Sequence, residues 1–559
     1  MIARLRHLVP PGKPDWIRLG LFGAALTACL LIIYRYELAN GFRLIPGDSH
    51  DSIIQAAILE HWHNVLLGRA NWTDAGYFYP HKWTIAQTDA YFLIGLAYFP
   101  FRLLGFDPFL SAELTGLFIK PIGFIGAYIL ARKALKASFW WCLLAAVLFT
   151  LSNGMTSHSY RLQLSSVAFA PLLGWLVWET VDALLAGKAA KFRLLGALSG
   201  LLFGALCLTC LYIAWFFAFF TVFLLLALGL IHFRGQAAAP RSKPPRMYGS
   251  LVLVMGITLL ALAPSVYMFL SKSQEVGVRS YHDALAFTVP VSEILQTGSN
   301  NLSSGRLYNS LLSYLAPGYK PGNEYSTTGF SIPLFILFVL GCALVLRTRR
   351  LQQEDSVLAA AVIATISTWL LVLNFWGWSG WYLVFSVFPG AKALRAVATY
   401  QIFLALPVVI IAVRWLSRQG TRPLISILLA GLLIACELNQ PYLRLNRNLE
   451  LRRASVTTPP AGCRVFYVSG WSGQEGIGES PYRMDDLYAH NVTAIFIAQE
   501  LRIPTINGFA SFNPPDWNFG FPNHPDYDQR VRAYAQQHEI KGLCKLDLNT
   551  KRWQEAGLP

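Results

Sequence analysis

The stretch PGDSHDSIIQAAILEHWHNVLLG (residues 46–68) decides how the rest of the chain is interpreted. Asp48 and Asp51 flank His50, follow a Pro-Gly turn and open an amphipathic run. One interpretation is local: Asp48 is a helix N-cap and Asp51 the third helical residue, so both carboxylates face the positive end of the helix dipole. A second interpretation is that the carboxylates have a function at the membrane surface, because the first long apolar segment, residues 17–34, ends shortly before the stretch.

The composition is that of a membrane protein. Of the 559 residues, 54% are hydrophobic and only 14% are charged, whereas a soluble domain carries about a quarter charged residues. The apolar residues form long uncharged runs, which predicts a polytopic α-helical protein with membrane lipids as partners. The net charge of +16 lies largely in short clusters between these runs. We therefore do not interpret it as nucleic-acid binding.

These basic clusters predict the topology, because Lys and Arg gather on the cytoplasmic side of membrane helices. The clusters lie at 4–18, 132–136, 188–193, 234–246, 347–350 and 414–422. About eleven spans follow, with a cytoplasmic N-terminus and the C-terminus outside, at residues 17–34, 110–131, 138–152, 165–182, 193–210, 212–231, 248–269, 329–346, 357–374, 399–416 and 421–437. The run 193–231 is too long for one helix and is interpreted as a hairpin that turns near Thr209–Tyr212.

One apolar segment does not fit this alternation. Residues 90–104, AYFLIGLAYFPFRLL, are short and contain Pro100 and Arg102. A span here would invert the side of every later basic cluster. We therefore interpret the segment as re-entrant or interfacial, within the first outside loop.

Two domains are expected. Residues 1–437 form a transmembrane domain with two large outside loops, 35–109 and 270–328, and residues 438–559 form a small α/β domain outside the membrane. In this tail, CRVFYV (463–468) and GLCKLDL (542–548) are predicted strands, and 485–501 and 526–538 are predicted helices. Cys463 and Cys544, the only cysteines of the tail, are a candidate disulfide. The alternative is two free buried thiols.

Three outside carboxylates are candidate catalytic groups. Asp48, Asp51 and Asp89 lie on one side, beside hydrophobic elements, where carboxylates cost energy unless they are paired, hydrated or used. Capping accounts for Asp48 and Asp51 but not for Asp89, and solvation in a wet loop is the other alternative. His50 together with Asp48 and Asp51 is a candidate divalent-metal site, although we favour a metal-free interpretation.

Four outside basic residues are candidates for phosphate binding. Lys392 and Arg395, three residues apart in PGAKALRA, would share one helix face and grip phosphate oxygens. Their position breaks the positive-inside pattern, although interfacial snorkelling is an equally simple explanation. His158 and Arg161, in SHSYRLQ, are also outside, where a polar membrane boundary alone would explain them.

Several pieces resemble the GT-C superfamily of polytopic glycosyltransferases, in bacterial members of uncharacterised specificity. The likeness rests on their order and topological placement, and they are GDSHDS (47–52), FYPHKWTIAQTDAYFL (78–93), SNGMTSHSYRLQLSSVAFAPLL (152–173), FPGAKALRA (388–396) and IPTINGFASFNPPDW (503–517). The metal-dependent branch of the superfamily also carries an acidic pair in a second outside loop. Residues 153–164 contain no such pair.

The resemblance implies an activity for the candidate residues. A sugar would pass, with inversion, from a polyprenyl-phosphate donor to a hydroxyl acceptor at the outer face of the bacterial inner membrane. By position Asp48 matches the early acid of the superfamily and is the expected base, with Asp51 as the alternate. Asp89 would orient the acceptor or tune the base.

Two other classes of function are weighed against the enzyme. A transporter or flippase typically carries ionisable residues near mid-span, and here only Glu113 and Lys120, in the second span, stand out. A non-catalytic membrane scaffold, with the tail as a binding module, would tolerate substitution of all three carboxylates.

Overall fold

The computed structural model describes residues 15–235, 245–301, 303–319, 325–347, 353–419, 423–441, 443–470, 484–510 and 512–555. Parts of four basic clusters lie outside these residues, at 4–13, 241–243, 349–350 and 422.

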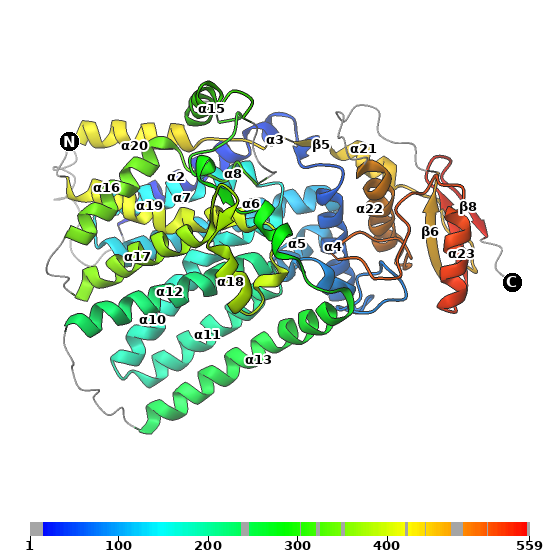
Figure 1. Cartoon of the computed structure of the whole chain (residues 1–559), viewed down its shortest axis with the longest axis horizontal. Helices are drawn as coiled ribbons and strands as arrows, with labels where there is room; N and C mark the ends of the chain where they lie inside the picture. The colour runs from blue at the N-terminus through cyan, green and yellow to red at the C-terminus, as the bar shows by residue number, and fades with distance from the viewer. Residues whose placement is uncertain are drawn as a thin grey trace.

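Long apolar helices make up most of the described chain (Figure 1). Seven helical stretches are long and apolar enough to cross a membrane: α2 (Trp16–Ile33), α6 (Pro108–Leu135), α9 with α10 (Leu162–Leu185), α11 (Ala189–Cys207), α12 (Leu211–Gly235), α13 (Pro245–Val276) and α19 (Tyr400–Arg418). The shorter apolar helices are α5 (Phe92–Leu103), α7 (Phe139–Thr150), α16 (Ile332–Arg347), α17 (Gln353–Val372) and α20 (Pro423–Glu437).

The sequence placed most of these helices correctly. Each of the eleven predicted spans overlaps a helix, although the number that cross the membrane stays a prediction. The hairpin in 193–231 is confirmed, since α11 ends at Cys207 and α12 begins at Leu211. The segment 90–104 forms the twelve-residue helix α5. Its buried neighbour Glu60 pairs with Arg102, with Oε2 2.8 Å from Nε.

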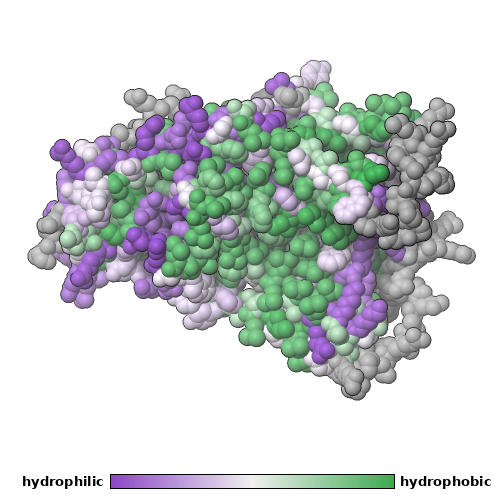
Figure 2. All heavy atoms as spheres, turned by 180° about the vertical axis from the view of Figure 1, so that it is seen from behind, coloured by the Kyte–Doolittle hydropathy of each residue, from purple (hydrophilic) through white to green (hydrophobic). Residues whose placement is uncertain are grey.

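A wide hydrophobic surface covers the helices (Figure 2). On α13, large side chains such as Val252, Leu259 and Leu260 are exposed, as expected of a lipid-facing helix. The inner face of α13 packs closely on α11, because α11 carries glycines where the two helices touch. A Cβ on Gly200 would lie 2.3 Å from Thr258, and one on Gly204 would lie 2.5 Å from the carbonyl of Ala261, so only small residues permit this packing.

The two ends of the helical bundle differ in their chemistry. At one end Lys133 pairs with Glu179 and with Asp182 (2.7 Å), and Arg414 donates to the carbonyl of Leu135 at 2.9 Å. The predicted outside pieces gather at the opposite end, where the short helices α3 (Arg35–Ala39), α4 (Asp51–Leu66), α8 (Asn153–Ser157), α14 (Tyr281–Ala286), α15 (Ser304–Leu315), α18 (Trp381–Val387) and α21 (Arg447–Ala454) occur.

Two small sheets tie these outside pieces together. β1 (Leu44–Pro46) pairs antiparallel with β5 (Arg444–Asn446), which joins the first outside loop to the chain beyond α20. β2 (Val289–Pro290) pairs parallel with β3 (Leu373–Phe375), which pairs antiparallel with β4 (Trp378–Ser379). Segments far apart in the sequence therefore share one end of the bundle.

The tail forms a third sheet beyond the helices, at the right of Figure 1. β6 (Val465–Ser469) is parallel to β7 (Leu543–Asp547), which pairs antiparallel with β8 (Arg552–Glu555). The connection from β6 to β7 contains α22 (Met484–Leu501) and α23 (Tyr527–Gln537). The predicted strands and helices of the tail are thus confirmed.

The tail packs directly on the first outside loop. The backbone N–H groups of Phe78 and Tyr79 donate to the carbonyls of Asn507 (3.1 Å) and Thr505 (3.0 Å). The side chain of Asn64 on α4 donates to the carbonyl of Gln499 on α22 at 3.1 Å. These bonds fix the tail over the region that contains GDSHDS and Asp89.

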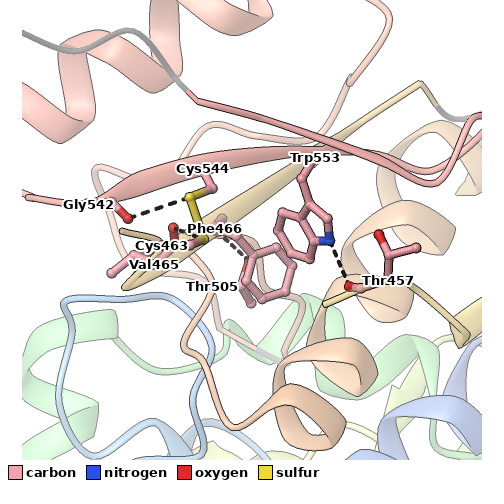
Figure 3. Close-up of a disulfide and its surroundings, with 8 residues drawn as sticks. All are labelled: Thr457, Cys463, Val465, Phe466, Thr505, Gly542, Cys544 and Trp553. Atoms are coloured by element: carbon pink, nitrogen blue, oxygen red, sulfur yellow. Dashed lines mark hydrogen bonds between the residues drawn. A yellow bond between two sulfur atoms is a disulfide. The ribbon is translucent and has the colours of Figure 1, made fainter. Parts of the chain in front are cut away.

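Cys463 and Cys544 are joined by a disulfide that links the start of β6 to β7, with Cα atoms 5.6 Å apart (Figure 3). The bond lies in a small core with Phe466, whose ring meets the indole of Trp553 edge-on at 5.7 Å.

Replacing Cys463 and Cys544 together by Ser is expected to lower the stability of the tail by ~2–4 kcal/mol, because the bond closes a long loop in the unfolded chain. Thermal unfolding of the purified protein measures the loss. Dithiothreitol should lower the melting temperature of the wild type and leave the double variant unchanged. Equal sensitivity of both proteins would show that the bond does not form in solution.

Candidate functional site

Asp48 holds the turn that leads into α4. Its Oδ1 accepts from the backbone N–H of His50 (2.9 Å) and of Ser52 (3.2 Å). The predicted N-cap position is wrong, because α4 begins at Asp51 and His50 occupies the cap. Asp48 lies two residues before the cap, but its carboxylate still accepts from the backbone N–H of Ser52 in the first turn of α4. Among the described residues none donates to Oδ2, which gives this half-buried carboxylate an oxygen for chemistry.

Asp51 lies on the first turn of α4 and pairs with a buried arginine. Its Oδ2 is 3.2 Å from Nη2 of Arg161, whose side chain is only 3% exposed. The guanidinium of Arg161 also lies over two rings, 4.6 Å from the centroid of Tyr325 and 5.1 Å from that of Tyr160. The carboxylate and the two rings hold the charge of Arg161 in one place.

His158 lies against the same aromatic rings. Its imidazole stacks on Tyr160 and Tyr325 at 6.3 Å each, and Nε2 is 3.4 Å from Oγ1 of Thr327. Burial lowers the pKa of His158 to about 3, and the charge of Arg161 acts in the same direction. His158 is therefore neutral at physiological pH and supplies packing and hydrogen bonds rather than charge.

Lys392 and Arg395 do not share a helix face, which corrects the sequence-based expectation. Lys392 is exposed within a short 3-10 turn, Ala391–Ala393, and the chain leaves this turn in an extended conformation at Leu394. The side chains lie over different rings, Lys392 6.0 Å from Phe385 and Arg395 4.7 Å from Phe287. The Pro-Gly turn before them and the small residues around them favour this irregular path over a helix.

Arg279 joins this region and was missed by the sequence analysis. Its backbone N–H donates to the carbonyl of Lys392 at 3.1 Å. Burial lowers the pKa of Arg279, and the nearby charge of Arg395 lowers it further. Arg279 is a further cation in the predicted outside loop 270–328, three residues beyond the end of α13, but no distinctive spacing marks it.

We call Arg161, Arg279 and Arg395 the arginine cluster. Its members come from three separate segments. Arg161 lies over Tyr325 and Arg395 over Phe287, and these two rings have centroids 6.2 Å apart. Arg279 joins them through its backbone, whose N–H donates to the carbonyl of Lys392, three residues before Arg395. Fixed guanidinium groups of this kind suit the oxygens of a phosphate.

Asp89 contacts the start of α12. Its Oδ1 accepts from the backbone N–H of Leu211 at 3.0 Å, and its Oδ2 accepts from the thiol of Cys210 at 3.7 Å. Surrounding protein raises the pKa of Asp89 to about 6, although part of the residue still reaches solvent. Burial raises the pKa of Tyr91, and the charges of Asp89 and Asp51 raise it further.

The tail also reaches the arginine cluster. The ring of Phe512 lies 4.7 Å below the guanidinium of Arg279. The carbonyl of Phe512 accepts from the side chain of Gln87 at 2.9 Å, two residues before Asp89. The segment 503–517 therefore lies against both the cationic and the acidic parts of the candidate site.

The candidate metal ligands of the sequence analysis do not form a compact set. Among the described residues, the one group of three His, Cys, Asp or Glu ligand atoms within 4.8 Å of one another is His81, Asp516 and His538. Asp48, His50 and Asp51 are not such a group in this structure. Asp51 faces Arg161 instead.

The fold as a whole is that of a GT-C-type membrane protein, as the sequence predicted. The solved structure that shows this is the arabinofuranosyltransferase AftD from Mycobacteria, with a TM-score of 0.50 at 15% identity, covering 88% of this chain and 32% of that one. The chain thus spans about a third of that protein. The oligosaccharyltransferase of Archaeoglobus fulgidus, solved with Zn and sulfate, aligns with a TM-score of 0.46 at 12% identity, covering 93% and 67% of the two chains. No protein-family model and no curated sequence matches.

Replacing Asp89 by Asn is expected to raise stability at pH 7.5 by about 2–3 kcal/mol, because the raised pKa means that the charged carboxylate costs folding energy. An acid whose folded pKa exceeds its unfolded pKa loses stability as the pH rises from about 4 through about 6. The gain should therefore shrink as the pH falls and vanish at about pH 3, where both states are protonated. Melting temperatures of the two proteins at these pH values measure the effect. A gain of equal size at both pH values would contradict it.

Proposed function

We propose that the protein is an inverting glycosyltransferase that moves a sugar from a polyprenyl-phosphate donor to a hydroxyl acceptor outside the bacterial inner membrane. The observation that carries the proposal is the meeting of outside carboxylates and the arginine cluster at one end of a hydrophobic bundle. Such an arrangement supplies a proton acceptor and a phosphate site next to the membrane that holds the polyprenyl chain.

The reaction assigns Asp48 and the arginine cluster separate roles. Oδ2 of Asp48 takes the proton of the acceptor hydroxyl while its oxygen bonds to the anomeric carbon of the sugar. The bond from that carbon to the phosphate oxygen breaks, and the polyprenyl phosphate leaves with the electron pair. Guanidinium groups stabilise the negative charge that develops on the phosphate.

The other residues support these two groups. Asp51 holds Arg161 in place through its ion pair, whereas Oδ2 of Asp48, to which no described residue donates, is available to the acceptor hydroxyl. Asp89 orients the acceptor, and neutral His158 packs against Tyr325. Lys392, exposed at the rim, attracts the phosphate before it reaches the arginines.

The arrangement of domains in the proposal follows the predicted topology. Residues 1–437 bind the donor within the membrane, and residues 438–559 cover the site outside it, with the segment 503–517 closest to the acceptor. The GT-C fold supports this arrangement, and the transferred sugar is a hexose or a pentose. In this proposal, side chains of the protein carry out both the proton transfer and the stabilisation of the leaving phosphate.

The buried charged residues of α6 favour a transporter less than the polar site favours an enzyme. Glu113 is 8% and Lys120 1% exposed. The ammonium of Lys120 donates to the carbonyl of Met155 at 2.7 Å, which gives it a structural role at the start of the 153–161 segment. The polar residues that gather instead lie at the end of the bundle.

The experiment that tests the function compares the cell-envelope glycans and glycolipids of three strains by mass spectrometry. The strains are a deletion, the deletion with the wild-type protein, and the deletion with Asp48→Asn at matched expression. A hexose-sized or pentose-sized mass that is lost in the deletion and restored only by the wild type would support the transferase. Identical glycans in all three strains would overturn it and favour a transporter or scaffold.

A further inference from the structure

His81, Asp516 and His538 form a compact group where the first outside loop meets the tail. Nε2 of His81 lies 3.0 Å from Oδ1 of Asp516, and Nε2 of His538 lies 2.7 Å from Oδ2. The ligand atoms of the three residues all lie within 4.8 Å of one another. Tetrahedral zinc holds neighbouring nitrogen and oxygen ligands about 3.4 Å apart, so small side-chain rotations would open the group around an ion.

A second carboxylate orients His81 from behind. Its Nδ1 lies 3.0 Å from Oε1 of Glu275, at the outer end of α13. The other oxygen of Glu275 accepts from the ammonium of Lys272 at 2.8 Å, and the same ammonium donates to the carbonyl of Lys82 at 2.8 Å. A carboxylate behind the remote ring nitrogen is the usual support of a metal-binding histidine, since it fixes the tautomer that leaves Nε2 for the metal.

His538 is held as firmly as His81. Its ring packs on Tyr534 of α23, with centroids 4.3 Å apart, and the hydroxyl of Tyr534 donates to the carbonyl of Tyr79 at 3.1 Å. The side chains of His81, Asp516 and His538 are 16%, 27% and 21% exposed. The group is thus sheltered but reachable by an ion from solvent.

We propose that His81, Asp516 and His538 bind a divalent transition metal of the zinc class, through both Nε2 atoms and the carboxylate, with water in a fourth position. Two imidazoles and one carboxylate match the ligand preference of Zn²⁺ rather than that of Mg²⁺ or Ca²⁺. The site is separate from the residues of the proposed transfer reaction, and the proposal does not rest on that reaction.

The metal would cross-link segments that are 435 residues apart in the chain, His81 and Asp516. Asp516 is near the end of the segment 503–517, and Phe512 of the same segment lies against Arg279. A bound ion would therefore hold this part of the tail over the first outside loop. Metal binding should raise the melting temperature of the intact protein, because the ion binds only the folded arrangement.

The test uses the full-length protein, purified in detergent without a polyhistidine tag and stripped of metal with a chelator. Zn²⁺ is titrated by calorimetry, and bound metal is counted by mass spectrometry after desalting. We expect one Zn²⁺ per chain, with affinity reduced at least ~10²-fold by His538→Ala or Asp516→Asn. His524→Ala is the matched control, because His524 lies in the same part of the tail, is 58% exposed and pairs with Asp526 instead.

A second measurement uses the wild-type protein alone, so it remains valid if the variants do not fold. Co²⁺ added to the stripped wild type should give the visible absorption of a four- or five-coordinate nitrogen and oxygen site, and Zn²⁺ should displace it. Wild-type protein that binds less than one Zn²⁺, or that shows only the spectrum of hydrated Co²⁺, would overturn the proposal. So would equal Zn²⁺ affinity in the wild type and a folded His538→Ala variant.

Discussion

Protein that carries Asp48→Asn is expected to fold normally and to lose ~10²–10⁴-fold of its transfer rate, the usual contribution of a general base. Asn is the informative substitution, because its side-chain oxygen still accepts the N–H groups of His50 and Ser52 and keeps the turn intact. Only the ability of Oδ2 to take a proton is removed. Transfer by purified protein, with extracted lipid-linked sugar as donor, measures the rate.

Asp528→Asn is the control for this variant. Asp528 is a half-buried acid of the tail that pairs with Lys545 at 2.6 Å, and no contact joins it to the arginine cluster among the described residues. Its replacement should leave the rate within twofold of the wild type. Full activity of the Asp48→Asn protein would move the base to Asp51 or Asp89, and equal losses in both variants would point to a general effect of altered charge.

Arg279→Gln is expected to lower kcat/KM by ~10–100-fold, since a hydrogen bond to a charged group contributes about 1.5–3 kcal/mol. Its stability should not fall below that of the wild type, because burial lowers the pKa of Arg279 and the charge that Gln removes therefore costs folding energy. Arg279→Lys should recover only part of the activity, because an ammonium lacks the planar fork that binds two phosphate oxygens. Kinetics at varied donor concentration measure the change.

Arg306→Gln is the matched control for the phosphate site. Arg306 lies on the same long outside loop but on α15, where its Nε donates to the carbonyl of Ser299 at 3.4 Å. Donor affinity that falls equally in both variants would show that Arg279 acts through the general positive charge of the loop. An unchanged kcat/KM for Arg279→Gln would remove it from the site.

Much of the fold was accessible from local patterns. Apolar runs and basic clusters predicted the helices at each of eleven places and the break before Leu211, because each charged residue in a membrane carries its own energetic cost. Alternation and amphipathic periodicity likewise predicted β6, β7, α22 and α23 in the tail.

The candidate site was predictable only in part. Asp51 and Arg161 were both named from the sequence, but their ion pair was not, because they lie on different segments. Lys392 and Arg395 were expected on one helix, and the irregular path around Leu394 separates them. Arg279, Phe287 and Tyr325 were missed because arginine and aromatic residues at a membrane surface are common and carry no distinctive spacing.

The sequence by itself determined that this is a polytopic membrane protein with a tail of strands and helices. Hydropathy and charge act locally, so their pattern along the chain is sufficient for that conclusion. Only the tertiary structure decided which side chains meet: Arg161 over Tyr325, and His81 beside Asp516 and His538. These contacts join residues up to several hundred positions apart, and they depend on how the outside segments pack, which no local pattern specifies.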